Sequence, residues 1–475
     1  MNKIYKLLLL LLLPLSSVAQ PQTLTQEQCR EMAIENSFNL KTSQEKIAAS
    51  EDMLMAYKTN NLPNFSLSGS YLYSTASFNE AITGGYLPTF SPDLTTGEMI
   101  PNVVGYGEDG SAIFSSYAYM PDMLFDFEVG SFYNVGLQAT QPIYMGGKVS
   151  TAIKLAKVGV EAAQAEENRT RADVILAADE AFYTFLKVGE LLNAANAYRI
   201  VVDECYRQVE SLFKNGMCTK NDLMKVQVKL NEAELQQLKA KNGVILARMN
   251  LCYIIGLPIS TLDLEVVDTF DMQQSIDTSL DVTSRPEFEL LEKSIEVKEL
   301  EAKLVQSDFK PSISAIASYN YANGLNLNGK ALLGSSPSFT GGVMINIPIF
   351  HWGEGRRKLS AARREVAIAE NTQADLVQKM TLELMQSINA YNEAQAKVAL
   401  MECIVEQTEE NLRQSAKQHA AGMETISDYL EAQALWQKAT SDLVEAKAGQ
   451  RLAYAQLCRT RGDVGELRVS RHNFD

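Results

Sequence analysis

The sequence has little of the material from which catalytic and metal sites are built. Its 475 residues include three histidines and two tryptophans, and they contain no G-x-S-x-G, H-E-x-x-H, P-loop or C-x-x-C motif. Those motifs position nucleophiles, metal ligands, phosphates and redox cysteines. We therefore predict no catalytic residue, no metal ligand and no cofactor, and an exported enzyme is the least favoured interpretation.

Positive charge and cysteine are also scarce. Lys and Arg total 43 against 58 Asp and Glu, which gives a formal net charge of −15. Because a broad basic surface is absent, we expect no nucleic-acid partner. Six scattered cysteines are too few for a disulfide scaffold in a chain of this length. Most are expected to be small apolar helix residues, although Cys252 and Cys458 could form one bridge.

Only the N-terminus carries a long apolar run. Lys3 and Lys6 precede Leu7–Leu13, and Ser17–Ala19 follows, which is typical of a secretory signal peptide cleaved after Ala19. An N-terminal anchor helix is the less favoured alternative, because spanning a bilayer takes about 20 apolar residues, roughly twice this run. No later run approaches that length, so any entry into a membrane must use strands.

The chain contains an internal duplication. A shift of 248 residues aligns Pro63 with Pro311, and a shift of 206 aligns Gly216 with Gly422. The difference, 248 − 206 = 42 residues, is an insertion in the first half between Pro63 and Pro142. Each half is therefore the same structural unit, and the first half carries a long extra loop.

A long helical segment follows the strands in each half. Apolar residues in Ile175–Phe185 recur in steps of three and four, and those in Leu384–Tyr391 keep the same register. A mean spacing of 3.5 residues predicts a left-handed coiled coil of long helices. The distance from Pro142 to Gly216, 216 − 142 = 74 residues, leaves room for a helix of roughly 65 residues, about 100 Å long.

Four segments alternate with a period of two: Phe65–Ser74, Phe127–Gln141, Ile313–Tyr321 and Phe339–Ile349. Each is about ten residues long or more, the length of a tilted membrane strand. The apolar face could meet a protein core or lipid. We favour lipid because the opposite face is small and polar, as a water-filled lumen requires, and aromatic residues gather toward one end. The residues expected to face lipid are Val129, Tyr133, Val135, Leu137, Ile313, Tyr319, Tyr321, Val343 and Ile345.

Four strands cannot close a membrane barrel, since the smallest natural barrels have about eight. Open sheet edges are not tolerated in hydrocarbon, so several chains must combine their strands. Two chains would supply eight strands around a lumen filled by side chains, and three would supply twelve strands with room for a pore. The strand count therefore predicts a homo-oligomer.

The whole pattern resembles the TolC family of outer-membrane efflux and secretion ducts over roughly residues 24–462. The resemblance is carried by the duplicated helix, strand, strand, long helix, helix unit. Its further features are Arg285-Pro286-Glu287 at the start of the second half, the strand exits Gln141-Pro142-Ile143 and Ile347-Pro348-Ile349, and the tip segment from Gly422 to Gln433. Each motif alone is weak, but their order and spacing together are specific.

The resemblance implies a mainly helical fold with a β-barrel membrane part. It implies a homotrimer whose twelve-stranded barrel in the outer membrane continues into a twelve-helix periplasmic tunnel. The partners would be further copies of the chain, outer-membrane lipid, a periplasmic adaptor of the membrane-fusion type and an inner-membrane pump of the RND or ABC type. The duct would be passive, because no motif for ATP or ion coupling is visible. The alternative is a periplasmic coiled-coil structural or adaptor protein with a soluble sheet.

The duplication and the resemblance together divide the chain into segments. The first half follows the signal peptide, the second half follows an equatorial linker, and each long helix ends at a tip turn. The predicted segments are 1–19 signal peptide, 20–62 N-terminal helix, 63–147 strand pair with loop 76–126, 148–255 tunnel helices with a tip near 216, 256–283 linker, 284–310 second N-terminal helix, 311–353 strand pair with loop 322–338, 354–462 tunnel helices with a tip near 422, and 463–475 tail.

The resemblance also implies roles for residues at the tips. Acidic side chains six and nine positions after the second tip glycine would line the pore aperture, and these are Asp428 and Glu431. Three copies would form a cation-binding ring of carboxylates, and a solvated helix face is the alternative. The basic residue that the family often has two positions after that glycine is replaced here by Glu424. The tip and adaptor-contact residues are expected to be Gly216, Lys220, Asp222, Gly422 and Glu424.

The insertion is acidic. From Thr59 to Gly147 there is no Lys or Arg, but there are eight Asp or Glu residues. We predict that three copies of loop 76–126 ring the exit as an acidic vestibule that attracts cations or forms a lid, with a plain solvated loop as the alternative. Five cations instead follow the last strand on the periplasmic side, where they could meet lipid headgroups or cover a helix face: Arg356, Arg357, Lys358, Arg363 and Arg364.

Overall fold

The computed structural model describes residues 22–75, 77–261, 264–266, 279–327, 330–331 and 337–463. The predicted signal peptide, part of the predicted linker and residues 464–475 of the tail lie outside this set. The described residues divide into two compact units. The helical unit lies within Met1–Leu54, Lys154–Ala302 and Leu359–Asp475, and the strand unit within Met55–Ile153 and Lys303–Lys358.

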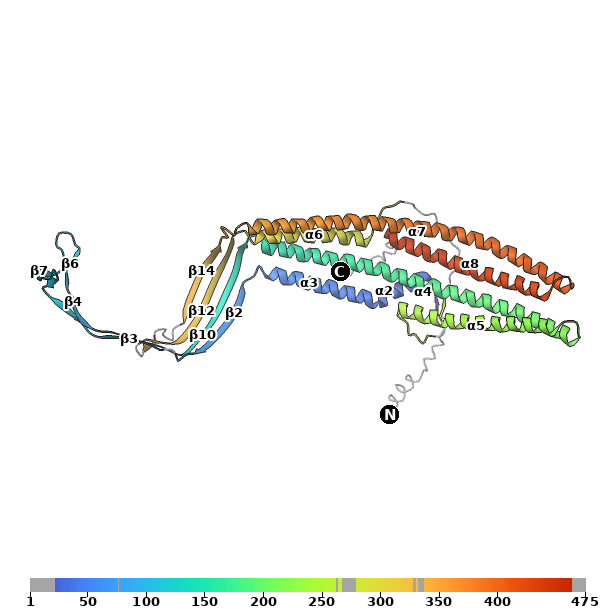
Figure 1. Ribbon diagram of the computed structural model, residues 1–475, viewed down its shortest axis with the longest axis horizontal. Helices are drawn as coiled ribbons and strands as arrows, with labels where there is room; N and C mark the ends of the chain where they lie inside the picture. Colours follow the sequence, from blue (N-terminus) through green and yellow to red (C-terminus); the bar gives the residue numbers. More distant parts are fainter. Residues whose placement is uncertain are drawn as a thin grey trace, which may run out of the picture. The chain divides into compact units, whose positions relative to one another are not determined.

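Two helical hairpins dominate the helical unit (Figure 1). The first joins α4 (Lys148–Lys214) to α5 (Lys220–Ile255), and the second joins α7 (Glu354–Ala420) to α8 (Ile426–Arg461). Both α4 and α7 have 67 residues, and both α5 and α8 have 36, with bounds related by the 206-residue shift. The prediction of long helices is confirmed, and each 67-residue helix is about 100 Å long.

Shorter helices accompany each hairpin. The N-terminal segment forms α2 (Gln26–Asn36) and α3 (Phe38–Thr59), and α6 (Pro286–Ser307) is the counterpart of α3 at the 248-residue shift. A single helix was expected over 20–62, but Ser37 has extended ψ (122°), which interrupts the helical hydrogen bonding. The Ser37 hydroxyl then accepts the backbone N–H of Leu40 at 3.3 Å and caps α3.

The coiled-coil positions read from the sequence form the core. In α4, Ile175, Ala178 and Phe182 are buried, and in α7 Leu384 and Tyr391 are buried. The largest cluster joins α2, α4 and α5 and also includes Leu24 and Leu264, which belong to a parallel pair of short strands, β1 (Gln22–Leu24) and β11 (Leu264–Val266). Burial of one apolar stripe per helix therefore holds the hairpins to the shorter helices.

Ion pairs join helices that are distant in the sequence, both within the first half and between the two halves. Asp179 on α4 is 3% exposed and binds Arg30 of α2 through two hydrogen bonds of 2.6 and 2.7 Å. Arg459 of α8 binds Asp173 of α4 (2.8 Å) and Glu287 of α6. Burial alone would raise the pKa of Glu287, but the hydrogen bond and charge of Arg459 lower it below its ordinary value of 4.5. Arg459 therefore joins a first-half helix to a second-half helix, and the Glu287 carboxylate that it binds stays ionised at neutral pH.

Three of the cysteines, Cys29, Cys205 and Cys252, are buried, and none of the six forms a disulfide. All six are free, including Cys252 and Cys458, so the bridge considered between these two is absent. Cys29 is fully buried, and burial, with a smaller effect of Asp179, raises the pKa of its thiol to about 12. Such a thiol stays protonated and unreactive at neutral pH.

The strand unit is an antiparallel sheet with four long strands (Figure 1). Their order is β14 (Ser338–Asn346), β12 (Ser312–Leu327), β10 (Met123–Met145) and β2 (Asn64–Tyr73). Two shorter strands also belong to this sheet. β3 (Ser77–Ile82) pairs with β10, and β13 (Lys330–Ala331) pairs with β12. The prediction of four strands of about ten residues or more is in accord with this sheet.

The inserted segment is not a plain loop but a set of short antiparallel pairs. Residues expected as a loop over 76–126 form three two-stranded sheets beyond β3. Strands of three or four residues contain too few alternations to be recognised in a sequence. The pairs are β4 (Gly85–Pro88) with β9 (Tyr117–Met120), β5 (Phe90–Pro92) with β6 (Met99–Pro101), and β7 (Val103–Tyr106) with β8 (Ala112–Phe114).

Candidate functional site

The sheet register brings the predicted lipid-facing residues to one face. Leu137 of β10 pairs with Leu67 of β2 on one side and with Tyr319 of β12 on the other, and Tyr319 pairs with Phe339 of β14. This row crosses all four strands, and alternation places the neighbouring odd-numbered positions on the same face. The predicted residues on this face are Tyr133, Val135, Leu137, Ile313, Tyr319, Tyr321, Val343 and Ile345. Only the backbone of Val129 is described, and it pairs with Leu325.

This apolar face is uncovered. Leu67 and Phe339 are 75% and 73% exposed, and Val343 and Ile345 are exposed as well. An exposed apolar patch that crosses four strands marks a surface that contacts lipid or another chain. The opposite face of the same strands carries mostly small or polar side chains: Ser66, Ser68, Ser70, Asn134, Gln138, Thr140, Ser314, Ser318, Asn320 and Thr340.

The first tip turn joins α4 to α5. Gly216 adopts φ +71°, which glycine tolerates without the strain that a side chain would introduce. Thr219 then caps α5, because the backbone N–H of Asp222 donates to the Thr219 hydroxyl (3.2 Å) and that hydroxyl donates to the Asp222 carboxylate (2.7 Å). The hydrogen bond from Thr219 lowers the pKa of Asp222. Lys220, the first residue of α5, is exposed beside this cap.

The second tip turn repeats this geometry between α7 and α8. Gly422 has φ +74°, and Thr425 caps α8 with the same pair of hydrogen bonds to Asp428 (3.3 and 2.7 Å). Asp428 therefore has a structural partner in addition to any role at an aperture. Glu431 lies one turn further along α8 and is exposed.

Glu424 does not point freely into solvent. Its carboxylate accepts a hydrogen bond from the Ser415 hydroxyl at 2.7 Å, so it links the end of the turn to the last turns of α7. Nδ1 of His419 lies 3.2 Å from the Glu424 carbonyl oxygen, and the imidazole stacks on Tyr429 of α8 with 5.2 Å between ring centroids. The acid that replaces the family's basic residue thus closes the turn of its own hairpin. The sequence did not predict this contact.

The two hairpins meet near their tips. Nζ of Lys225 on α5 donates to the Ser427 hydroxyl of α8 at 3.0 Å. Beneath this bond Val226, Ile426 and Leu430 are buried with residues of α4. A groove of about 600 Å³ runs between α5 and α8, with Met224, Lys229 and Glu431 among its lining residues. Both predicted tip segments therefore border one surface.

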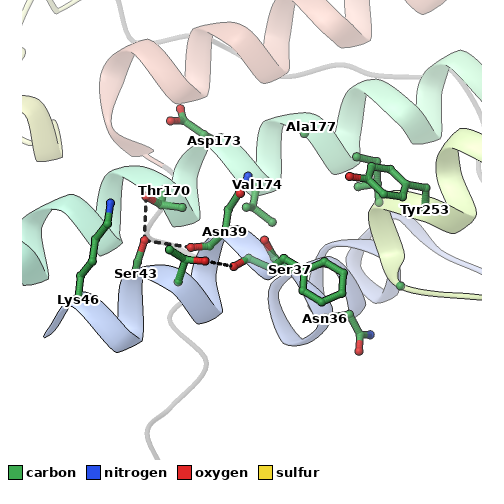
Figure 2. A pocket seen from close by; sticks show the side chains of 14 residues that line it. Asn36, Ser37, Asn39, Ser43, Lys46, Thr170, Asp173, Val174, Ala177 and Tyr253 are labelled. Carbon is green, nitrogen blue, oxygen red and sulfur yellow. Dashed lines mark hydrogen bonds between the residues drawn. The ribbon is translucent and has the colours of Figure 1, made fainter. Parts of the chain in front are cut away.

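A second pocket of about 420 Å³ lies where α2 passes into α3, beside α4 and α5. Figure 2 shows Ser43 on α3 facing Thr170 on α4, and their hydroxyl oxygens lie 3.3 Å apart. Asp173 is also part of the lining, but its carboxylate is already bound by Arg459. The pocket depends on the interruption at Ser37, so no sequence motif marked it. It provides hydroxyls and amides, but no nucleophile paired with a base.

The described part of the chain offers no group of three or more His, Cys, Asp or Glu side chains that could hold a metal ion. Within the same residues, no helix combines the length and the apolarity needed to cross a bilayer.

Comparison with known proteins decides the identity. The chain matches the family described as "Outer membrane efflux protein" over residues 29–257 and 282–463. It belongs to the outer membrane efflux protein family. Membership makes it an outer-membrane channel of efflux or secretion systems with a helical tunnel in the periplasm, and not an enzyme. The resemblance to the TolC family is confirmed, and the alternative of a periplasmic spacer protein is set aside.

Similar proteins and structures agree with this membership. The alkaline protease secretion protein AprF of Pseudomonas aeruginosa is 24% identical over 338 residues, 66% of this chain and 68% of that protein. The outer-membrane channel CmeC of Campylobacter jejuni has a TM-score of 0.69 and 18% identity, covering 92% of this chain and 85% of that one. The open-state channel MtrE of Neisseria gonorrhoeae has a TM-score of 0.69 and 17% identity, with coverage of 92% and 88%. This efflux protein therefore has the fold of these channels.

Proposed function

We propose that three copies of this efflux protein form one passive exit duct, with a twelve-stranded barrel in the outer membrane above a twelve-helix periplasmic tunnel. The observation that carries the proposal is the pair of open sheet edges. Within the described residues, the long strands β2 and β14 each have only one long neighbour. Because the four strands alternate in direction, β14 of one copy can pair antiparallel with β2 of the next. Two copies would leave a lumen filled by side chains, whereas three leave a pore.

The two faces of the sheet support the same arrangement. The exposed apolar face suits outer-membrane lipid, and the Ser-, Thr- and Asn-rich face suits a water-filled lumen. The lipid-facing positions would be the predicted residues on the exposed apolar face of the sheet, together with Val129.

The tips are proposed as the gate and the docking surface. An adaptor that docks at the tip turns, beside Gly216 and Gly422, would contact Lys220, Asp222 and Glu424. Asp428 and Glu431 would contribute six carboxylates to the aperture of a trimer. A periplasmic adaptor and an inner-membrane RND or ABC-type pump would open it and supply the energy. The name of the relative AprF indicates protein secretion as one use of such a duct.

Interchain disulfides between strand edges test the trimer. Cysteine is introduced at Ser66, Ser68 or Ser70 of β2 together with Thr340 or Gly342 of β14, in a chain whose exposed Cys403 is changed to Ser. We expect one combination to give covalent dimers and trimers on non-reducing gels after extraction from outer membranes. The matched control is Q138C/S318C, whose residues are partners within one chain and should give only monomers.

The outcome separates the oligomeric states. A ladder that ends at three chains supports the proposed duct, and a ladder that ends at two contradicts it. Monomers from every β2 and β14 combination, with the control disulfide formed, would show that these edges do not meet.

A further inference from the structure

The exit from the last strand into α7 exposes large apolar side chains. After β14 ends at Asn346, Ile349 and Trp352 are 91% and 89% exposed, and Phe350 is exposed too. The rings of Phe350 and Trp352 meet edge to face with 4.9 Å between centroids. Such a cluster adds little to the packing of its own chain, because most of each side chain is exposed.

Trp352 also has a strained backbone. Its φ is +50°, and it is the one residue other than glycine with positive φ among the described residues. Its counterpart at the 206-residue shift is Gly146, with φ +64°, so both halves need this conformation but only the second places a side chain there. A left-handed backbone costs a residue with a side chain about 1–2 kcal/mol. Strain of this kind persists where the side chain has a function.

Three positively charged residues follow Trp352 in the sequence, at the start of a helix, where the helix dipole disfavours positive charge. Arg356, Arg357 and Lys358 occupy the first turns of α7, near the positive end of the helix dipole. Lys358 is bound to Glu354 at 2.6 Å. Arg356 and Arg357 are exposed, and no carboxylate in the described part of the chain pairs with either. The corresponding residues of the first half are Ser150 and Thr151.

We propose that Trp352, Arg356 and Arg357 bind the headgroup of an anionic phospholipid in the periplasmic leaflet of the outer membrane. This inference rests on the proposed barrel, which puts the ends of β14 at the membrane surface. Indole rings lie at the level of lipid headgroups, and guanidinium groups bind phosphate through two parallel hydrogen bonds. In a chain of net charge −15, two unpaired arginines beside an exposed tryptophan form a local complement to an anionic headgroup.

Lipid retention by the purified full-length protein tests the site. Wild type, R356S/R357T and W352G are mixed in detergent with equal amounts of phosphatidylglycerol and phosphatidylcholine of matched acyl chains, and retained lipids are counted by native mass spectrometry. The substitutions introduce the residues that stand at the corresponding positions of the first half, Gly146, Ser150 and Thr151. We expect wild type to prefer phosphatidylglycerol and R356S/R357T to bind it about 25-fold more weakly, from roughly fivefold for each arginine. W352G should reduce retention of both lipids.

The control is K239S/K241S, which removes the same charge from exposed positions on α5 and should keep the preference. Inorganic phosphate at millimolar concentration should not displace the lipid. The inference is overturned if R356S/R357T keeps the wild-type preference, if K239S/K241S loses it equally, or if phosphate competes as well as lipid does. A heat-resistant trimer without the preference refutes the lipid site alone, whereas protein that never assembles refutes the duct as well.

Discussion

Single glycines decide where the helices of this efflux protein can end. Gly256 follows α5 with φ +79°, and a Cβ placed there would lie 2.3 Å from Cβ of Asn36, whose amide donates to the Ile255 carbonyl at 3.1 Å. Gly216 has a similar φ of +71°, but a Cβ there would meet nothing within 4 Å. A side chain at Gly216 would therefore introduce backbone strain alone, whereas a side chain at Gly256 would add a steric clash.

We predict that Gly256→Ala destabilises the protein more than Gly216→Ala. Both variants acquire about 1–2 kcal/mol of left-handed strain, but only the first must also displace Asn36 and its hydrogen bonds. The expected loss is about 3 kcal/mol for Gly256→Ala and about half of that for Gly216→Ala. Thermal unfolding followed by circular dichroism at 222 nm measures the difference. Equal shifts of the midpoint would show that the close approach to Asn36 costs nothing.

Residues far apart in the sequence mark the limit of what could be predicted. Periodicity identified Phe182 and Leu384 as core residues, because a helix repeats its buried face at a fixed spacing. Periodicity could not find the pair of Arg30 and Asp179, which are 149 residues apart and meet only after α2 packs on α4. The hydrogen bond between Ser415 and Glu424 could not be predicted from periodicity either, because it depends on the path of the turn.

At the scale of elements, duplication was the strongest guide. Equal spacing between the proline and glycine markers of both halves predicted equal long helices, and α4 and α7 have the same length. The strand pairs of the insertion were missed because they are shorter than the alternation that identifies a strand. The division at Ser37 was missed because serine can cap a helix or lie within one, and tertiary packing decides which.

The tip hairpins allow the aperture hypothesis to be tested against helix capping. We predict that D428A/E431A weakens the block of channel current by multivalent cations in bilayer recordings, because a trimer loses six carboxylates near the gate. The Asp428 carboxylate also accepts the hydroxyl of Thr425, the N-cap of α8, so the double variant should be destabilised by about 1 kcal/mol as well.

Asp222 is the matched control, since it accepts the Thr219 hydroxyl as Asp428 accepts that of Thr425, and it accepts the Thr219 backbone N–H in addition. D222A should show at least the same loss of stability with little change in cation block. If D222A and D428A/E431A relieve the block equally, the effect comes from a loosened tip, and the aperture assignment fails.

At the scale of the whole molecule, charge is distributed unevenly along the chain. The segment from Thr59 to Gly147 has no Lys or Arg, and its acidic residues lie on β3, on β10 and in the turns between the short strands. Some of these acids are structural. The carboxylates of Asp93 and Asp109 accept backbone N–H groups of Thr95 and Ser111 at 2.8 and 3.1 Å. The exposed side chains of Glu80, Glu98 and Glu108 do not hold turns in this way. These three residues can therefore be substituted to test the acidic vestibule.

We predict that E80Q/E98Q/E108Q lowers the permeability ratio of cations to anions by about twofold without changing trimer assembly, because nine fewer negative charges ring the exit of a trimer. The ratio is measured from reversal potentials in asymmetric KCl. At 0.1 M salt the field of these charges extends about 10 Å, and at 1 M only about 3 Å, so the difference from wild type should disappear at high salt. An unchanged ratio at 0.1 M would mean that the segment is a solvated appendage with no influence on what enters the duct.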